Sequence, residues 1–146
     1  MASIIDVAKY ILDCHGTMST MKLQKLCYYS QAWCLAWEER PLFNEDFQAW
    51  ANGPVCYELF NWHRHKFLIS SDELPQIIGD NLNDSEKKII NKVLEFYGDK
   101  DAHWLSELTH QERPWKDARQ KANALPGDPC EQIITKESML DYYSGL

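Results

Sequence analysis

The stretch from Met21 to Trp37 constrains the fold more than any other part of the sequence. After Lys25 it carries almost no polar side chain except Gln31. With helical periodicity, one face collects Leu23, Leu26, Cys27, Ser30, Trp33, Cys34 and Trp37, while Tyr28, Tyr29 and Ala32 cover much of the rest. A helix that is apolar nearly all round is usually buried on several sides. We therefore predict a central buried helix over about 20–39, too short and too polar at its start to span a bilayer.

The flanking sequence predicts further helices around this one. Ser3 and Asp6 form an S-x-x-D capping box before an apolar stripe, which indicates a helix over 4–15. Additional helices are expected to begin near residues 84, 101, 114 and 135, each at a capping residue or a proline. The fold class that we predict is mainly α with minor β structure, a compact multi-helix domain around the central helix.

Two short segments have strand character. Residues 47–50 and 132–134 are β-prone, and we expect them to pair as a two-stranded element. Between them, Asn52-Gly53-Pro54 is a strong breaker. Because proline suits the first turn of a helix, a helix over about 55–65 is expected directly after it.

The composition is that of an acidic globular protein, and residues 1–146 are expected to form a single domain. A net charge of −7 weighs against nucleic acid and anionic membranes as partners, and it suits a basic protein partner. The five cysteines include no C-x-x-C pair, which indicates reduced core thiols in a cytoplasmic protein. The N-terminus lacks the long apolar run of a signal peptide.

No pattern predicts a catalytic site, a metal site or a cofactor. His63 and His65 are two residues apart and His103 and His110 are seven apart, which are not zinc-binding spacings. The sequence also contains no G-x-S-x-G elbow and no glycine-rich phosphate loop. We therefore expect a protein that is not an enzyme. A Cys–His hydrolase stays open as an alternative, because any such pair could meet in the fold.

Two features leave a nucleic-acid or anion contact open. The first predicted helix, a short turn and the Lys22/Lys25 start of the central helix have roughly the shape of a helix-turn-helix. Arg113, Lys116 and Arg119 follow at a spacing that would form a small basic ridge on a helix. The aromatic coat of the central helix and the net charge both oppose DNA binding.

Several motifs occur together in a recognisable order. They are Lys22-Leu23-Gln24-Lys25-Leu26-Cys27-Tyr28-Tyr29 with Trp33, Arg40-Pro41-Leu42-Phe43, Ala49-Trp50 before Gly53-Pro54-Val55, Val93 with Tyr97-Gly98, Leu105 to His110, and Pro114-Trp115. Over about residues 4–143 the chain thereby resembles the Panacea antitoxin domain, the SocA-like, phage-associated GepA-type family.

The resemblance implies a non-enzymatic antitoxin that neutralises a toxin encoded beside it, by direct protein–protein contact. Alternatives are an adaptor that delivers the toxin to a cytosolic protease, or a helix-turn-helix DNA-binding regulator. The motif positions expected to build the scaffold are Leu23, Leu26, Trp33, Gly53, Pro54, Leu108, His110 and Trp115. The partner-binding surface is predicted near Lys25, Tyr29, Trp50 and Glu58.

Overall fold

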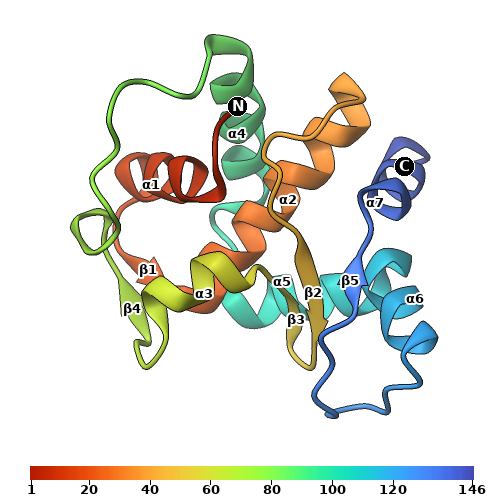
Figure 1. The fold of residues 1–146 in the computed structure, drawn as a ribbon. Helices are drawn as coiled ribbons and strands as arrows, with labels where there is room; N and C mark the ends of the chain where they lie inside the picture. The colour runs from red at the N-terminus through yellow and green to blue at the C-terminus, as the bar shows by residue number, and fades with distance from the viewer.

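The computed structural model describes residues 1–146, and helix α2 (Thr20–Glu38) crosses it diagonally (Figure 1). Thirteen of the nineteen residues of α2 are buried. Ser19 caps its start, where the hydroxyl accepts a hydrogen bond from the Lys22 amide (3.2 Å). No acidic residue lies in the first turn and no basic residue in the last, so packing rather than the helix dipole holds α2 in place. The predicted central buried helix is confirmed.

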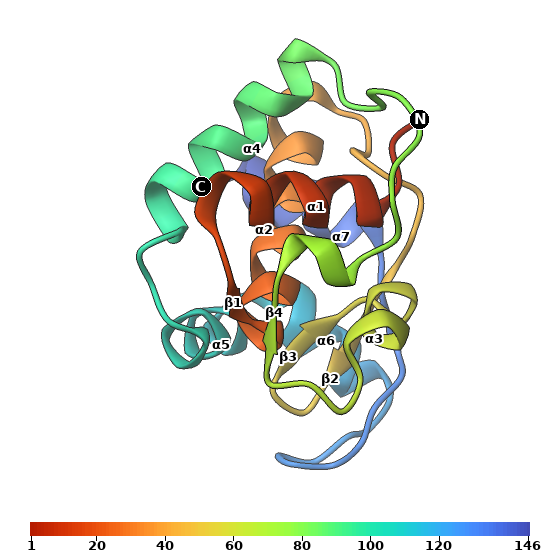
Figure 2. The same ribbon diagram turned by 90° about the vertical axis from the view of Figure 1, so that its left-hand side faces the viewer.

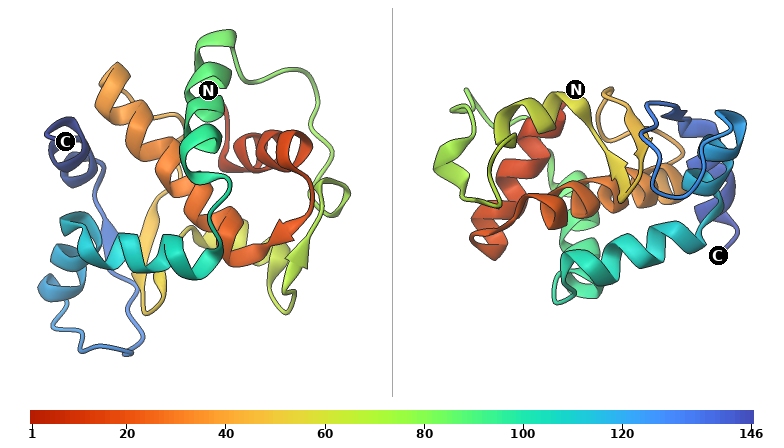
Figure 3. Two further views of the ribbon diagram at one scale, coloured as in Figure 1. Left: turned by 180° about the vertical axis from the view of Figure 1, so that it is seen from behind. Right: turned by 90° about the horizontal axis from the view of Figure 1, so that it is seen from below.

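Six further helices surround α2. They are α1 (Ile4–His15), α3 (Tyr57–His63), α4 (Asp84–Tyr97), α5 (Ala102–Gln111), α6 (Arg113–Lys121) and α7 (Lys136–Ser144). Figure 2 shows α1 lying across the face of α2, and Figure 3 shows α4 and α5 at the back of the molecule as viewed in Figure 1. Helix α7 packs along α2 as well. The mainly α fold with minor β structure agrees with the prediction.

The helix starts follow local sequence chemistry. Ser3 and Asp6 form the predicted capping box of α1, in which the Asp6 amide donates to the Ser3 hydroxyl (3.2 Å). Side chains of Asn83, Asp101 and Thr135 cap α4, α5 and α7 in the same way. These caps explain why the predicted helix starts near 84, 101 and 135 agree with the structure.

The minor β structure consists of two small antiparallel sheets. In the larger sheet, β2 (Phe47–Trp50) lies between β3 (Gly53–Val55) and β5 (Ile133–Ile134), with Phe47 opposite Ile134. The predicted pairing of 47–50 with 132–134 is therefore confirmed. In the smaller sheet, β1 (Met18–Ser19) pairs with β4 (Leu68–Ile69), which the sequence analysis missed.

The helix expected over 55–65 was placed too early. Gly53 to Val55 form strand β3, with Pro54 opposite Ala49 in β2, and α3 begins only at Tyr57. Proline is tolerated here because β3 is an edge strand and needs no amide on its outer side. The segment between β4 and α4 contains one 3-10 turn at Ser71–Glu73.

One hydrophobic core fills the space between these elements. It gathers apolar residues of α1, α2, α4 and α7 with those of the central sheet. All five cysteines are free thiols, and only Cys14 is exposed. None of the helices combines the length and the apolar character that crossing a membrane requires.

Candidate protein-binding surface

The four predicted contact residues do not share one surface. Lys25 and Tyr29 are buried within α2, at 1% and 0% exposure, because other elements surround this helix. Trp50 is half-buried at the end of β2, and Glu58 is exposed on α3. A partner that docks on the folded chain can therefore reach only Trp50 and Glu58 of the four.

Lys25 lies beneath the β2–β3 hairpin with few polar partners. Its Nζ donates one long hydrogen bond to the Pro54 carbonyl (3.3 Å), and no carboxylate lies within ion-pair distance. Gly53 makes room for the side chain, because a Cβ at this position would lie 2.6 Å from Lys25 Cε. Burial disfavours the ammonium and lowers the pKa of Lys25 to about 7. Lys25 therefore contacts the β2–β3 hairpin from its buried side.

Tyr29 belongs to a second buried polar cluster, around Glu112. The hydroxyls of Tyr29 and Tyr143 both donate to Glu112 Oε1 at 2.7 Å. Tyr143 Oη also lies 3.1 Å from Tyr28 Oη. Burial raises the pKa of the Glu112 carboxyl, while the two tyrosine hydroxyls lower it in part. This cluster ties α2, α7 and the junction of α5 and α6 together, so Tyr29 has a structural role.

Aromatic side chains gather on the outside of α3. The Phe60 ring contacts the rings of Trp50 and Tyr57, with centroid distances of 4.8 and 6.1 Å. The Arg64 guanidinium lies 5.5 Å from the Phe60 centroid and has no acidic partner. We call Trp50, Tyr57, Glu58, Phe60 and Arg64 the α3 surface. Tyr57 is 44% exposed, so this cluster opens to solvent.

Gln24 holds α3 against α2. The Gln24 Oε1 atom accepts from the Cys56 amide (2.8 Å), and Gln24 Nε2 donates to the Cys56 carbonyl (3.1 Å). The same Nε2 lies 3.0 Å from Nε2 of His63, the last residue of α3. Both Gln24 and His63 are buried. Sequence reasoning missed this anchor, although a glutamine in an apolar helix was a signal for a buried hydrogen-bonding role.

The predicted scaffold residues all lie in or against the core. Leu23, Leu26, Gly53 and Pro54 are buried, whereas Trp33, Leu108, His110 and Trp115 are half-buried.

Two of these scaffold residues support the α3 surface. The Trp115 indole nitrogen donates to the Trp50 carbonyl (2.8 Å), and the His110 ring stacks on Trp115 at a centroid distance of 4.0 Å. His110 Nε2 is buried without a hydrogen-bond partner, and burial lowers the pKa of its imidazole. These contacts link α5 and α6 to the end of β2, where Trp50 lies.

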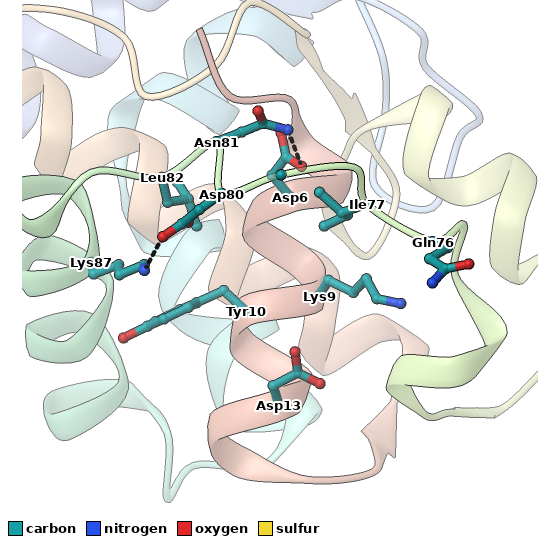
Figure 4. A pocket seen from close by; sticks show the side chains of 11 residues that line it. Asp6, Lys9, Tyr10, Asp13, Gln76, Ile77, Asp80, Asn81, Leu82 and Lys87 are labelled. Atoms are coloured by element: carbon teal, nitrogen blue, oxygen red, sulfur yellow. Dashed lines mark hydrogen bonds and ion pairs between the residues drawn. The ribbon is translucent and has the colours of Figure 1, made fainter.

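A polar hollow of about 280 Å³ lies between α1 and segment 76–82 (Figure 4). One ion pair and one hydrogen bond connect residues of its lining. Lys87 Nζ lies 2.9 Å from Asp80 Oδ2, and Asn81 Nδ2 donates to Asp6 Oδ1 (3.2 Å). In Figure 4, Lys9 extends from α1 toward Gln76, and Asp13 lies further along the same helix. The hollow shows no nucleophile–base pair and no oxyanion site.

An apolar groove of about 210 Å³ runs between α2 and α4. It is lined by Trp33, Trp37, Lys92, Val93, Phe96 and Tyr97. Within its wall, the Trp33 indole donates to the Tyr97 hydroxyl (3.0 Å). Trp37 and Phe96 are exposed at the rim. This groove is a second apolar surface, on a different face from α3.

The structure does not favour the nucleic-acid alternatives. Helix α2 cannot enter a DNA groove because most of its side chains are buried. The predicted basic ridge is interrupted, since Arg119 is buried and donates to the carbonyls of Ala49, Leu125 and Asp128. No three His, Cys, Asp or Glu side chains come close enough together to hold a metal ion.

A search with family models found one match. The model of the antitoxin SocA-like Panacea domain matches residues 23–116, from within α2 to within α6. The matched range includes the α3 surface and its supports. The comparison with curated proteins found no match, and neither did the comparison with solved structures.

Proposed function

The chain belongs to the SocA-like antitoxin family defined by the Panacea domain, and on that premise we propose that it neutralises a cognate protein toxin by direct binding through the α3 surface. The family points to a toxin partner and to a non-enzymatic role. The partner's identity and the contact residues are our proposal. We further propose a cytoplasmic protein whose toxin is encoded by the neighbouring gene.

The exposed aromatic cluster on α3 is the observation that carries the proposed contact. Trp, Tyr and Arg dominate the residues that contribute most to protein interfaces. Tyr57 and Arg64 are exposed, and Trp50 is half-buried beside them. Glu58 adds a negative charge in a chain of net charge −7, which suits a toxin with a basic face.

The rigid support beneath this surface favours recognition as well. Gln24 anchors α3 to the buried helix, and Trp115 holds the end of β2. Side chains presented on ordered elements lose less conformational entropy on binding. The α3 surface can therefore bind a partner without a rearrangement of the core.

Co-expression with the product of the neighbouring gene tests the proposal. We expect this chain to restore growth to cells that make the toxin, and the two proteins to co-purify. Unchanged toxicity together with no co-purification would contradict the proposal. The half-life of the toxin, measured with and without this chain, distinguishes direct inhibition from delivery to a protease. A protease adaptor shortens the half-life, whereas a direct inhibitor leaves it unchanged or lengthens it.

A further inference from the structure

The bonds of Gln24 determine which His63 ring nitrogen carries a proton. The Cys56 amide can only donate, so the Gln24 atom that faces it is the carbonyl oxygen Oε1. Gln24 Nε2 is then the amide nitrogen, and its two hydrogens point to the Cys56 carbonyl and to His63 Nε2. His63 Nε2 must accept this hydrogen bond, which requires a neutral ring with its proton on Nδ1.

Protonation of His63 would break this arrangement. A second hydrogen, on Nε2, would face the amide hydrogen of Gln24, and Gln24 cannot turn over without losing both bonds to Cys56. His63 is 2% exposed, so the new charge would also be buried. The attraction between the residues would become a repulsion.

No side chain around His63 supplies a counter-charge for the imidazolium, and only the backbone hydrogen bond of His63 itself raises its pKa in part. Lys25 on α2 acts on His63 through space and, with burial as the larger cause, lowers its pKa. The Cys56 thiol before α3 is neutral, because burial raises its pKa to about 12. Arg64 follows directly in the chain, and the neighbouring aromatic ring is Phe60. No acidic side chain forms an ion pair with His63.

Helix α3 depends strongly on this contact. It is seven residues long, and only Leu59 and His63 on it are buried. A helix this short is not stable by itself and needs tertiary contacts. We propose that His63 and Gln24 form a proton-sensitive lock that holds the α3 surface on α2, and that protonation of His63 releases α3. In the part that concerns the toxin, this inference rests on the proposed function.

Hydrogen exchange of the isolated chain tests the lock without any toxin. The α3 amides of Phe60 and Arg64, which donate to the carbonyls of Cys56 and Phe60, report on α3 opening. After correction for intrinsic exchange, we expect their opening constant to rise below about pH 6.5, by about tenfold for each unit by which folding lowers the His63 pKa. Amides of α4 provide the internal reference and should change much less.

Two variants make the test specific. His63→Gln keeps an acceptor for Gln24 but cannot be protonated, so the rise in α3 opening below about pH 6.5 should disappear. His65→Gln removes an exposed histidine two residues away and should keep the wild-type rise. Equal α3 protection in wild type at about pH 7.5 and about pH 5.5 would overturn the lock, as would a rise below about pH 6.5 that persists in His63→Gln.

The tautomer of wild-type His63 gives a second readout that needs no variant. Nitrogen-15 spectra of the imidazole at about pH 7.5 should show the proton on Nδ1, and a proton on Nε2 would contradict the lock. Toxin binding below about pH 6.5 should weaken in wild type and not in His63→Gln. Absence of toxin binding at every pH would contradict the proposed function and leave the exchange result standing.

Discussion

Two buried ionisable side chains, Lys25 on α2 and Glu112 at the junction of α5 and α6, differ in how well their polar atoms are bonded. Glu112 Oε1 accepts hydrogen bonds from two tyrosine hydroxyls, each at 2.7 Å. Lys25 has a single bond of 3.3 Å to the Pro54 carbonyl and no counter-charge. Both are at least nine-tenths buried. The comparison separates a satisfied end of the core, next to α7, from an under-satisfied end beneath the β2–β3 hairpin.

The α3 surface lies at the under-satisfied end. Lys25 bonds to β3 and acts electrostatically on His63 of α3. Segments with few buried anchors open more easily than the rest of a protein, and binding regions are drawn from them. We therefore expect the contacts of Glu112 to contribute more to the free energy of unfolding than those of Lys25, which support the proposed contact surface.

The largest effect is expected at Glu112. Replacing Glu112 by Leu removes the acceptor of Tyr29 and Tyr143, of which Tyr143 keeps only the Tyr28 hydroxyl. Each unsatisfied buried hydroxyl costs roughly 1–3 kcal/mol, so the free energy of unfolding should fall by about 3–5 kcal/mol. Urea denaturation measures this change. The same replacement at exposed Glu95 is the control and should cost less than about 0.5 kcal/mol. Equal losses of stability for Glu112→Leu and Glu95→Leu would contradict the stabilising role of the Glu112 contacts.

A somewhat smaller loss is expected on the other side, at Gly53. Its φ of 117° is a conformation that side chains other than glycine rarely adopt, and an added Cβ would meet Lys25 Cε at 2.6 Å. Gly53→Ala should reduce the free energy of unfolding by about 2–4 kcal/mol. In a Lys25→Ala background, only the backbone part of this loss should remain. If the changes in free energy of unfolding are fully additive in the double mutant, residue 53 and Lys25 do not interact sterically, which contradicts the expectation.

Replacement of Lys25 itself is expected to stabilise the chain, in contrast to the two substitutions above. Lys25→Met removes a buried ammonium that has no acidic partner, and the free energy of unfolding should rise by about 2 kcal/mol at neutral pH, after loss of the Pro54 bond. In the wild type, the pKa of Lys25 is about 7 when folded, against an ordinary value of 10.5.

The unfolded chain therefore holds a proton that the folded chain has released, so wild-type stability should increase with pH between these two values. The Lys25→Met variant should lack this increase. Melting temperatures from about pH 7 to about pH 10 check both expectations. A Lys25→Met variant that is less stable than wild type and keeps the wild-type pH dependence would contradict the lowered pKa of Lys25.

Local signals in the sequence were sufficient for most of the helices and for the pairing of β2 with β5. Capping side chains at Ser3, Asp101 and Thr135 indicate where helices begin. The aromatic run after Lys25 indicates which helix is buried. The strand at Gly53–Val55 could not be predicted in this way. Proline is compatible with both a helix start and an edge strand, and only the pairing with β2 decides between them.

The candidate site was predictable in part. Trp50 and Glu58 are surface residues, but a lysine and a tyrosine in an apolar helix can be either exposed or buried. Their burial depends on distant partners: Pro54 lies opposite Lys25, and Glu112 opposite Tyr29. The role of Gln24 likewise depends on His63, far along the chain. Such long-range pairs leave no periodic trace in a single sequence.

The dissociation constant for the toxin, measured by titration calorimetry with two matched variants, tests whether α3 is the contact surface. Tyr57→Ala and Trp104→Ala each remove an aromatic ring of similar exposure, 44% and 41%, but Trp104 lies on α5, outside the α3 surface. We expect Tyr57→Ala to weaken binding by about 2 kcal/mol, roughly thirtyfold, and Trp104→Ala by less than about threefold. Weakening by Trp104→Ala with unchanged affinity for Tyr57→Ala would contradict the assignment of the toxin contact to α3.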